Sequence, residues 1–252
     1  MSTDPFVIEQ LRGIVGSQNV LDDPGATERY RRDFTGRFQA ESAVVVRPES
    51  TDEVVAIVKL CLEHEHAIVP QGGNSSLVGG AIPMAGEVVV SSERMAGVES
   101  FTTHAGVMAA GAGTTLDTLQ QTARVEGWDY CIDLASRGVA TLGGMIATNA
   151  GGSRVVRYGD TRNQVFGVEV VTGAGDVVSN IGGTLRDNTG YHLPSIVTGS
   201  EGTLGIVTRA RVRLHPHLPV RTTAVLRFED PAAAADAAES MRNSLPSVES
   251  VE

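Results

Sequence analysis

Short runs of β-branched residues alternate along the chain with longer stretches in which apolar residues recur every three or four positions. Three of these runs predict buried strands: 43–47 (AVVVR), 67–70 (AIVP) and 87–91 (EVVVS). The stretch 51–65 predicts a helix with its apolar residues on one face: Val54, Ile57, Val58 and Cys61. Ser50 and Glu53 have the spacing of a capping box at its start. Residues 43–70 therefore predict a β-α-β unit with a buried parallel pair of strands.

The middle of the chain continues with the same alternation. The predicted elements are a strand at 106–110, a turn at 111–113, a helix over 114–126, and strands at 165–172, 176–179 and 205–214. The turn Gly173-Ala174-Gly175 lies between two of these strands and favours a hairpin. In the last strand apolar or small residues alternate with arginines, which predicts that one face is buried and the other is exposed.

The two ends of the chain have a different character. Residues 5–16 and 24–37 predict short helices at the N-terminal end. After Pro216 and Pro219 the sequence predicts a strand at 221–228, an alanine-rich helix that begins after Asp230 and runs to about 243, and the start of a strand at 247–252. This strand-helix-strand unit lacks the further strands that would complete a sheet. We therefore expect it to need more chain or a partner to bury its apolar faces.

Composition narrows the class of function. The 252 residues carry a formal net charge of −10 and are 41% hydrophobic, which is ordinary for a folded protein. This charge argues against binding to nucleic acid or to an anionic membrane, because no broad positive field gathers phosphates. No apolar run approaches the roughly 18 residues of a spanning helix, and the first thirty residues lack the apolar stretch of a signal peptide. We therefore predict no membrane span and a cytoplasmic location.

Cysteine and histidine offer no recognisable metal site. Cys61 and Cys131 have no metal-ligand spacing and are predicted to be small core residues. His215 and His217 flank a proline on a predicted strand, where alternate side chains point to opposite faces. The sequence therefore predicts no metal.

Glycine is the informative residue, at 29 of 252 positions, about 12% against a usual share of about 7%. A P-loop is excluded because the only lysine, Lys59, lies inside a predicted helix. A Rossmann fingerprint would begin at Gly111 and Gly113, but Leu116 replaces its third glycine; Asp133 would be its acidic partner. The fingerprint is therefore weak, and the residues favour an ordinary strand-to-helix turn over a Rossmann site.

A second glycine segment lies between two predicted strands. Gly72-Gly73-Asn74-Ser75-Ser76 is followed by Gly79-Gly80. Consecutive glycines beside small polar residues can turn several backbone N–H groups inward and form an anion-binding concavity. The residues alone leave open whether this segment is such a site or a glycine-rich surface turn.

Four segments in this order resemble the FAD-linked oxidases, whose PCMH-type FAD-binding domain is shared by p-cresol methylhydroxylase and vanillyl-alcohol oxidase. The segments are 70–83 (PQGGNSSLVGGAIP), 133–159 (DLASRGVATLGGMIATNAGGSRVVRYG), 165–178 (VFGVEVVTGAGDVV) and 198–214 (TGSEGTLGIVTRARVRL). Within that family the chain is most similar to the D-2-hydroxyacid dehydrogenases. These include the D-lactate dehydrogenases, the D-2-hydroxyglutarate dehydrogenases and the D-type subunit of glycolate oxidase. The resemblance implies an α+β fold of two α/β subdomains, followed by the beginning of a ferredoxin-like cap domain. It divides the chain into an N-terminal helical segment (1–38), the FAD-binding domain (39–218) and an incomplete C-terminal substrate or cap domain (219–252).

The resemblance also implies which residues meet the cofactor. The first glycine loop would surround the FAD diphosphate, the stretch 133–152 would follow the ribityl chain and isoalloxazine edge, and the turn at 199–202 with Ile206 would lie near the adenine and ribityl parts. The full predicted set is Pro70, Gln71, Gly72, Gly73, Asn74, Ser75, Ser76, Gly79, Gly80, Asp133, Leu134, Gly138, Thr141, Gly143, Gly144, Thr148, Asn149, Gly151, Gly152, Glu201, Gly202 and Ile206.

Two departures from the family pattern matter. Members that attach FAD covalently often use a histidine in the first loop, but residues 71–83 contain neither His nor Cys. We therefore predict non-covalent FAD. His192, in NTGYHL, replaces an acid that the family usually has there, which puts the role of that loop in doubt.

The implied reaction is oxidation of a D-2-hydroxy acid of the lactate, glycolate or 2-hydroxyglutarate type, with hydride transfer to FAD. It needs a base at the substrate hydroxyl and cations for its carboxylate. In the resembled enzymes the cap domain supplies both, so no catalytic residue is named here. The predicted partners are this small-molecule substrate, a separate electron acceptor, and a cap-bearing chain or a second copy of the chain. The alternatives are an FAD-linked oxidase of another alcohol and an FAD-binding fragment or subunit without activity of its own.

Overall fold

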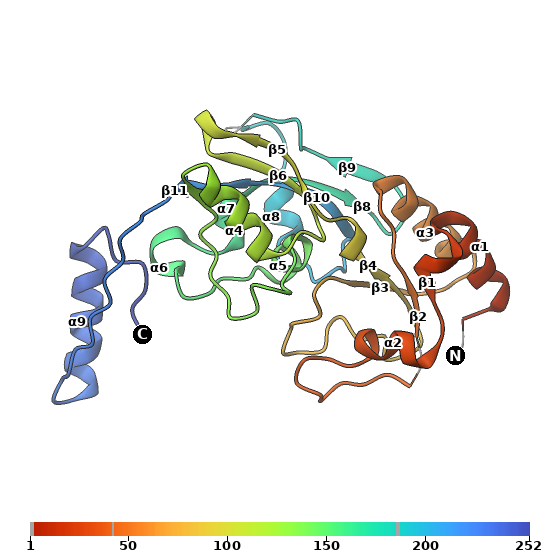
Figure 1. Cartoon of the computed structure of the whole chain (residues 1–252), viewed down its shortest axis with the longest axis horizontal. Coiled ribbons are helices and arrows are strands. Elements are labelled where there is room, and N and C mark those ends of the chain that lie inside the picture. The colour runs from red at the N-terminus through yellow and green to blue at the C-terminus, as the bar shows by residue number, and fades with distance from the viewer. Residues whose placement is uncertain (1–2, 42, 185–186) are drawn as a thin grey trace.

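The computed structural model describes residues 3–41, 43–184 and 187–252. Two sheets lie side by side and carry helices on their faces (Figure 1). The helices are α1 (Pro5–Val15), α2 (Pro24–Arg31), α3 (Thr51–Glu63), α4 (Leu116–Val125), α5 (Leu142–Thr148), α6 (Val155–Tyr158), α7 (Thr161–Gln164), α8 (Leu193–Val197) and α9 (Pro231–Ser244). The strands are β1 (Val20–Leu21), β2 (Val44–Val46), β3 (Ile68–Gln71), β4 (Val88–Ser91), β5 (Val98–Thr102), β6 (Val107–Gly111), β7 (Trp128–Asp129), β8 (Val165–Val171), β9 (Val177–Ser179), β10 (Ile206–Arg213) and β11 (His215–Pro216).

The first sheet has the order β1-β2-β4-β3. Strands β2, β4 and β3 are parallel, and β1 pairs antiparallel with β2. The three parallel strands are mostly apolar because both faces of the sheet are covered: α1 and α3 pack on one face, and Tyr30 of α2 packs on the other. The predicted β-α-β unit is confirmed, although β4 lies between its two strands, so these do not pair with each other.

Local sequence explains how the first helices begin. The side chain of Ser50 accepts a hydrogen bond from the amide of Glu53 (3.2 Å), which caps α3 as predicted. Glu53 does not complete the capping box, because its carboxylate accepts instead from the amide of Glu49 (2.7 Å). Asp4 caps α1, and Pro5 occupies its first turn.

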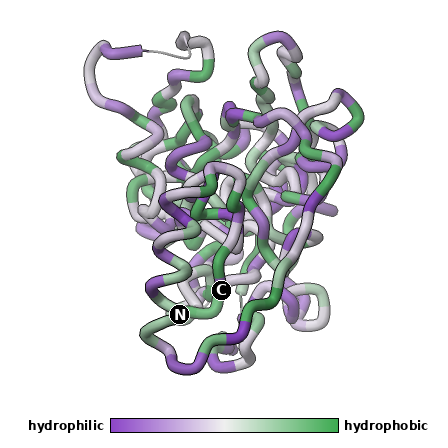
Figure 2. The backbone as a smooth tube through the Cα atoms, turned by 90° about the vertical axis from the view of Figure 1, so that its left-hand side faces the viewer, coloured by the Kyte–Doolittle hydropathy of each residue, from purple (hydrophilic) through white to green (hydrophobic). Residues whose placement is uncertain are grey.

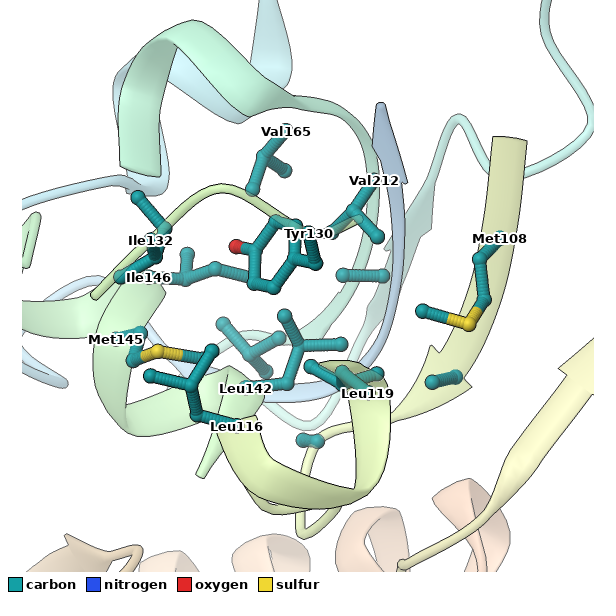
Figure 3. Packing of buried hydrophobic residues seen from close by; sticks show 14 of the residues in the cluster. Met108, Leu116, Leu119, Tyr130, Ile132, Leu142, Met145, Ile146, Val165 and Val212 are labelled. Atoms are coloured by element: carbon teal, nitrogen blue, oxygen red, sulfur yellow. The ribbon is translucent and has the colours of Figure 1, made fainter. Parts of the chain in front are cut away.

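The second sheet is antiparallel throughout, in the order β5-β6-β10-β8-β9. Helices α4 and α5 cover one face of it and enclose the larger core (Figure 3). Leu116, Leu119, Leu142 and Ile146 are fully buried around the ring of Tyr130. The predicted hairpin β8–β9 and the half-buried strand β10 are confirmed.

The two sheets share apolar contacts. Figure 2 shows that hydrophobic and hydrophilic stretches alternate along the backbone. Val171 of β8 and Ile206 of β10 belong to the core cluster that α1 and α3 form over the first sheet. A polar contact adds to this: the Glu169 carboxylate in β8 accepts hydrogen bonds from Thr51 of α3 (2.6 Å) and Thr208 of β10 (2.9 Å). Apolar and polar contacts therefore connect the two sheets.

Several elements differ from the prediction. The helix expected over 24–37 ends at Arg31, because the Asp33 side chain accepts from the amides of Thr35 and Phe38 and turns the chain back. Strand β5 was not predicted; it is an exposed edge strand with a register shift and shows no alternation of apolar and polar residues. Helix α5 was not predicted either, since its sequence contains two glycines.

The C-terminal end also differs from expectation. Helix α9 begins after Asp230, whose side chain accepts from the amide of Ala233 (2.8 Å), as predicted. The strands predicted at 221–228 and 247–252 are not strands in the described structure, where no neighbouring strand offers them a ladder. Helix α9 buries no residue and lies at the far end of the molecule from α1 (Figure 1).

Among the helices in the described ranges, none is both long enough and apolar enough to cross a lipid bilayer.

Candidate functional site

A cleft of about 290 Å³ lies between the two sheets. Three segments that are far apart in the sequence form most of its wall: the loop after β3, the segment 134–150 with α5, and the turn before β10. The predicted residues that line it are Pro70, Gln71, Gly72, Gly73, Asn74, Ser75, Ser76, Gly80, Leu134, Thr141, Gly143, Gly144, Thr148, Glu201, Gly202 and Ile206.

The cleft and the predicted set do not coincide everywhere. The predicted residues outside its lining are Gly79, Asp133, Gly138, Asn149, Gly151 and Gly152. The lining residues that the sequence analysis did not select are Ala81, Val90, Ser92, Ser136, Ala140, Met145, Ala147, Ala150, Ser200, Gly205 and Val207. All of these except Val90 and Ser92 lie inside the segments that carry the resemblance, but as mostly small or apolar residues they were not assigned individually to the cofactor.

The first two glycines of the β3 loop touch the second glycine segment. A Cβ at Gly72 would lie 2.3 Å from Oγ1 of Thr141, and a Cβ at Gly73 would lie 1.7 Å from the carbonyl oxygen of Val139. Only glycine permits this approach, because the group opposite Gly73 is backbone and cannot rotate away. The two segments that the sequence presents separately are thus one wall of the cleft.

Two predicted residues of this loop use their side chains to fix it to α2. Gln71, which is buried, donates from Nε2 to the carbonyl oxygens of Tyr30 (2.9 Å) and Ala81 (2.7 Å). Asn74 donates from Nδ2 to the carbonyl oxygens of Arg29 (3.1 Å) and Arg32 (2.8 Å), at the C-terminal end of α2. These contacts account for the NH2 groups of both side chains without any ligand, and they satisfy carbonyl groups that a helix end leaves open.

The backbone of the same loop presents donors to the cleft. Asn74 has φ +49°, the left-handed conformation that turns neighbouring N–H groups to one side. Within the described residues, the amides of Gly73, Asn74, Ser75 and Ser76 donate no hydrogen bond to another protein group. Glu201 is the one ionisable side chain among the lining residues that the structure describes. An anion here would therefore meet neutral backbone dipoles and hydroxyl groups.

The second segment is fixed by close backbone packing. Thr141 caps α5 by accepting from the amide of Gly144 (3.3 Å), and a Cβ at Gly143 would lie 2.9 Å from that of Ala112. A Cβ at Gly152 would lie 1.9 Å from the carbonyl oxygen of Asp133, so this glycine supports the segment from outside the cleft.

The other predicted residues of this segment also have protein partners. The Asn149 side chain donates to the carboxylate of Asp160 (2.8 Å) and accepts from the amide of Arg162 (3.0 Å). The Asp133 carboxylate pairs with Arg137 (2.8 Å). The contacts of both residues stabilise the conformation of the segment 133–152. They explain these two side chains without a ligand.

The turn at 199–202 is hydrogen-bonded to the C-terminal end of α5. The amides of Gly199 and Glu201 donate to the carbonyl oxygens of Ile146 and Ala147 (2.9 Å each). Gly202 has φ +83°, and a Cβ there would lie 3.0 Å from Cγ of Pro70. The turn thus closes the cleft against the end of β3.

The alternative glycine motif has a structural explanation. Gly111 and Gly113 do not line the cleft; a Cβ would lie 2.3 Å from the carbonyl oxygen of Met95 at the first and 1.9 Å from that of Ser92 at the second. They allow the turn between β6 and α4 to pack on the chain after β4, so this segment is a strand-to-helix turn.

A second cluster of charges lies outside the cleft, where the C-terminal segment meets the second sheet. Arg154 is 4% exposed and donates to Asp129 (2.8 Å) and to both carboxylate oxygens of Glu249 (3.0 and 3.1 Å). Tyr158 also donates to Glu249 (2.8 Å). Burial acts to raise the pKa of Glu249, but the hydrogen bonds from Arg154 and Tyr158 outweigh it and hold the pKa below its ordinary value of 4.5. Glu249 thereby anchors the segment after β11.

Both cysteines are fully buried core residues, as predicted. Burial raises the pKa of Cys61 to about 11 and that of Cys131 to about 12, so both remain protonated thiols at neutral pH. In the described part of the chain, no three His, Cys, Asp or Glu side chains gather as ligands for a metal ion. The absence of a metal remains a prediction.

Comparisons with known proteins agree with this geometry. Residues 42–180 match the profile of the FAD binding domain family. The chain is 36% identical to D-2-hydroxyglutarate dehydrogenase, mitochondrial, from Arabidopsis thaliana, over 91% of this chain and 41% of the relative. It is 39% identical to D-2-hydroxyglutarate dehydrogenase from Stutzerimonas stutzeri (89% and 48%) and 40% identical to the mitochondrial enzyme of Bos taurus (78% and 36%). The chain thus spans less than half the length of these relatives.

A solved structure of alkyldihydroxyacetonephosphate synthase superposes with a TM-score of 0.74 at 25% identity, covering 85% of this chain and 41% of that one. The α+β fold expected from the resemblance is confirmed, while the cap domain remains a prediction. Since the family profile spans more than half of the 252 residues, and the cleft presents neutral donors between two glycine segments, the chain belongs to the FAD binding domain family and binds FAD.

Proposed function

We propose that the cleft between the two sheets holds FAD with its diphosphate against the loop 72–76. The free amides of Gly73, Asn74, Ser75 and Ser76 carry this assignment, because a diphosphate needs several donors and the described lining offers no cation. The contact of Gly73 with Val139 supports it further, since it fixes this loop against the second glycine segment.

The rest of the dinucleotide would lie along the remaining walls. Met145, Ile206 and Val207 are apolar and line the cleft, as suits the flat faces of aromatic rings. The six predicted residues outside the lining would support the site from behind. The lining residues that the structure describes include no His, Cys or Tyr, which supports the proposal that the flavin is bound without a covalent bond.

We infer that the whole protein oxidises a D-2-hydroxy acid of the D-2-hydroxyglutarate type to the 2-oxo acid. The names of the relatives and their 36–40% identity support this class of substrate over lactate or glycolate. Bound FAD would supply the hydride acceptor. This chain's own residues would bind and orient the cofactor and exclude water from it.

The groups that act on the substrate would lie outside these 252 residues. Glu201 is exposed, so its carboxylate is a poor base for a buried hydroxyl group. We therefore assign no catalytic residue and propose that a cap-bearing segment, a partner chain or a second copy supplies the base and the carboxylate-binding cations. A separate acceptor would reoxidise the flavin. A cytoplasmic location stays a prediction, since relatives in Arabidopsis thaliana and Bos taurus are named as mitochondrial.

Two measurements test this function. The visible absorbance of the purified chain, loaded with FAD and then precipitated with acid, should pass entirely into the supernatant; flavin in the pellet would refute non-covalent binding. A chain that stays colourless with excess FAD would refute the cofactor site itself.

Bleaching of the flavin by D-2-hydroxyglutarate, but not by its L-enantiomer, is expected of the whole protein. If the chain alone is unreactive and a cap-bearing partner restores bleaching, the missing groups lie on that partner. Failure of every D-2-hydroxy acid to bleach the flavin with the partner present would favour an FAD-binding subunit without this activity.

A further inference from the structure

The position of Ser92 in the fold places it beside the proposed diphosphate loop. Ser92 follows β4, the strand that lies between β2 and β3, and opens a short 3-10 helix. Strands β3 and β4 are parallel, with Gln71 opposite Ser91. The next residues, Gly72 and Ser92, therefore leave the sheet side by side at the carboxyl edge, where parallel sheets bind their ligands.

Ser92 lines the cleft, and its hydroxyl group has no hydrogen-bond partner among the described residues. The residue is 8% exposed and lines the cleft, and its Oγ is buried with no hydrogen bond to any described group. Its backbone carbonyl oxygen, in contrast, accepts from the amide of Met95 (2.9 Å) and packs against Gly113.

The neighbouring hydroxyl groups lack this feature. Oγ of Ser91 accepts from the amide of Glu93 (3.5 Å) and starts the same short helix. Oγ1 of Thr114 is bonded to Gly97 and to Gly111 (2.7 Å). A buried hydroxyl without a partner is unfavourable, because it loses water and gains nothing in return. Of these three hydroxyl groups, only that of Ser92 bears this cost, and Ser92 lines the cleft.

We propose that the Ser92 hydroxyl donates a hydrogen bond to the diphosphate of the bound dinucleotide. This inference rests on the proposed function of the cleft. With no cationic side chain in the described lining, each neutral donor near the anion contributes, and a hydroxyl beside Gly72 extends the row of amides onto the neighbouring strand. A hydrogen bond to a charged acceptor is stronger than one between neutral groups. Ser92 is thus a binding residue that the glycine motifs do not reveal.

The test compares Ser92→Ala with Ser91→Ala. Each protein is freed of cofactor, its thermal midpoint is measured, and the dissociation constants for FAD and ADP are measured by flavin fluorescence and calorimetry. For Ser92→Ala we expect FAD and ADP affinity to fall together by roughly tenfold or more, while the midpoint of the cofactor-free protein stays equal or rises. For Ser91→Ala we expect the reverse: a lower midpoint and unchanged affinity, since its side chain points to the other face.

The outcomes separate the possible roles of Ser92. Wild-type affinity of Ser92→Ala for both ligands would overturn the proposal, and so would a fall in the cofactor-free midpoint that matches the loss of affinity. A loss of FAD affinity without loss of ADP affinity would overturn the assignment to the diphosphate. If the wild-type chain binds neither ligand, the proposed function fails before the role of Ser92 is in question.

Discussion

Replacing Gly73 with alanine tests whether the two glycine segments must touch for FAD to bind. The added Cβ would lie 1.7 Å from the carbonyl oxygen of Val139, whereas ordinary contacts begin at about 3.4 Å, so the backbones would have to separate by 3.4 − 1.7 = 1.7 Å. Because both groups are backbone, no side-chain rotation relieves the overlap. Overpacking of this kind costs about 1–3 kcal/mol.

This cost falls on the wall of the cleft, so we expect the affinity of Gly73→Ala for FAD to drop roughly 5- to 150-fold. Titration of cofactor-free protein with FAD, followed by flavin fluorescence, measures it. Gly173→Ala is the matched control: Gly173 lies in the β8–β9 turn with nothing within 4 Å of a Cβ, so its variant should bind as the wild type does. Wild-type affinity in Gly73→Ala would refute the close contact and the cleft built on it.

Two further changes probe the supports of the structure. Asn74→Ala removes two hydrogen bonds to α2 and places alanine at φ +49°, so the thermal midpoint should fall by about 4–8 °C; an unchanged midpoint would contradict the support role. Glu249→Gln should make the linker between β11 and α9 more sensitive to limited proteolysis. Arg221 of this linker loses an ion pair (3.5 Å), and Arg154 keeps only Asp129 as a carboxylate partner. The pKa of Glu249 is lower in the folded protein than its ordinary value of 4.5. The stability that its hydrogen bonds contribute is therefore fully present above pH 4.5 and is lost as the pH falls through the lowered pKa. Wild-type protein should therefore become equally sensitive in acid, whereas Glu249→Gln should show no such transition of its own.

The elements that were predicted correctly are those whose own residues show a cap or a clear pattern of apolar positions. Helix α3 has a cap and one apolar face, and β10 alternates along its length, so local chemistry and burial agree. Strand β5 and helix α5 were missed because packing against neighbours, and not local preference, determines them. The strands expected at 221–228 and 247–252 show the opposite case: suitable residues form no strand where the described structure offers no edge to pair with.

The candidate site was predictable where a motif carried it and not elsewhere. Glycine pairs located the loop at 72–76, but they did not show that Gln71 and Asn74 direct their side chains to α2. Ser92 could not be found at all, because its role depends on the register between β3 and β4. A register is a property of two strands together, and neither strand encodes it alone.

The neutral lining of the cleft has a consequence for how the chain acquires its cofactor. A protein with a net charge of −10 repels a dianionic nucleotide at long range, and no arginine or lysine in the described lining counters this field locally. Added salt shortens the reach of the repulsion to about 8 Å at physiological ionic strength. Uptake of FAD should therefore become faster as ionic strength rises, the reverse of pockets that capture phosphates with basic side chains.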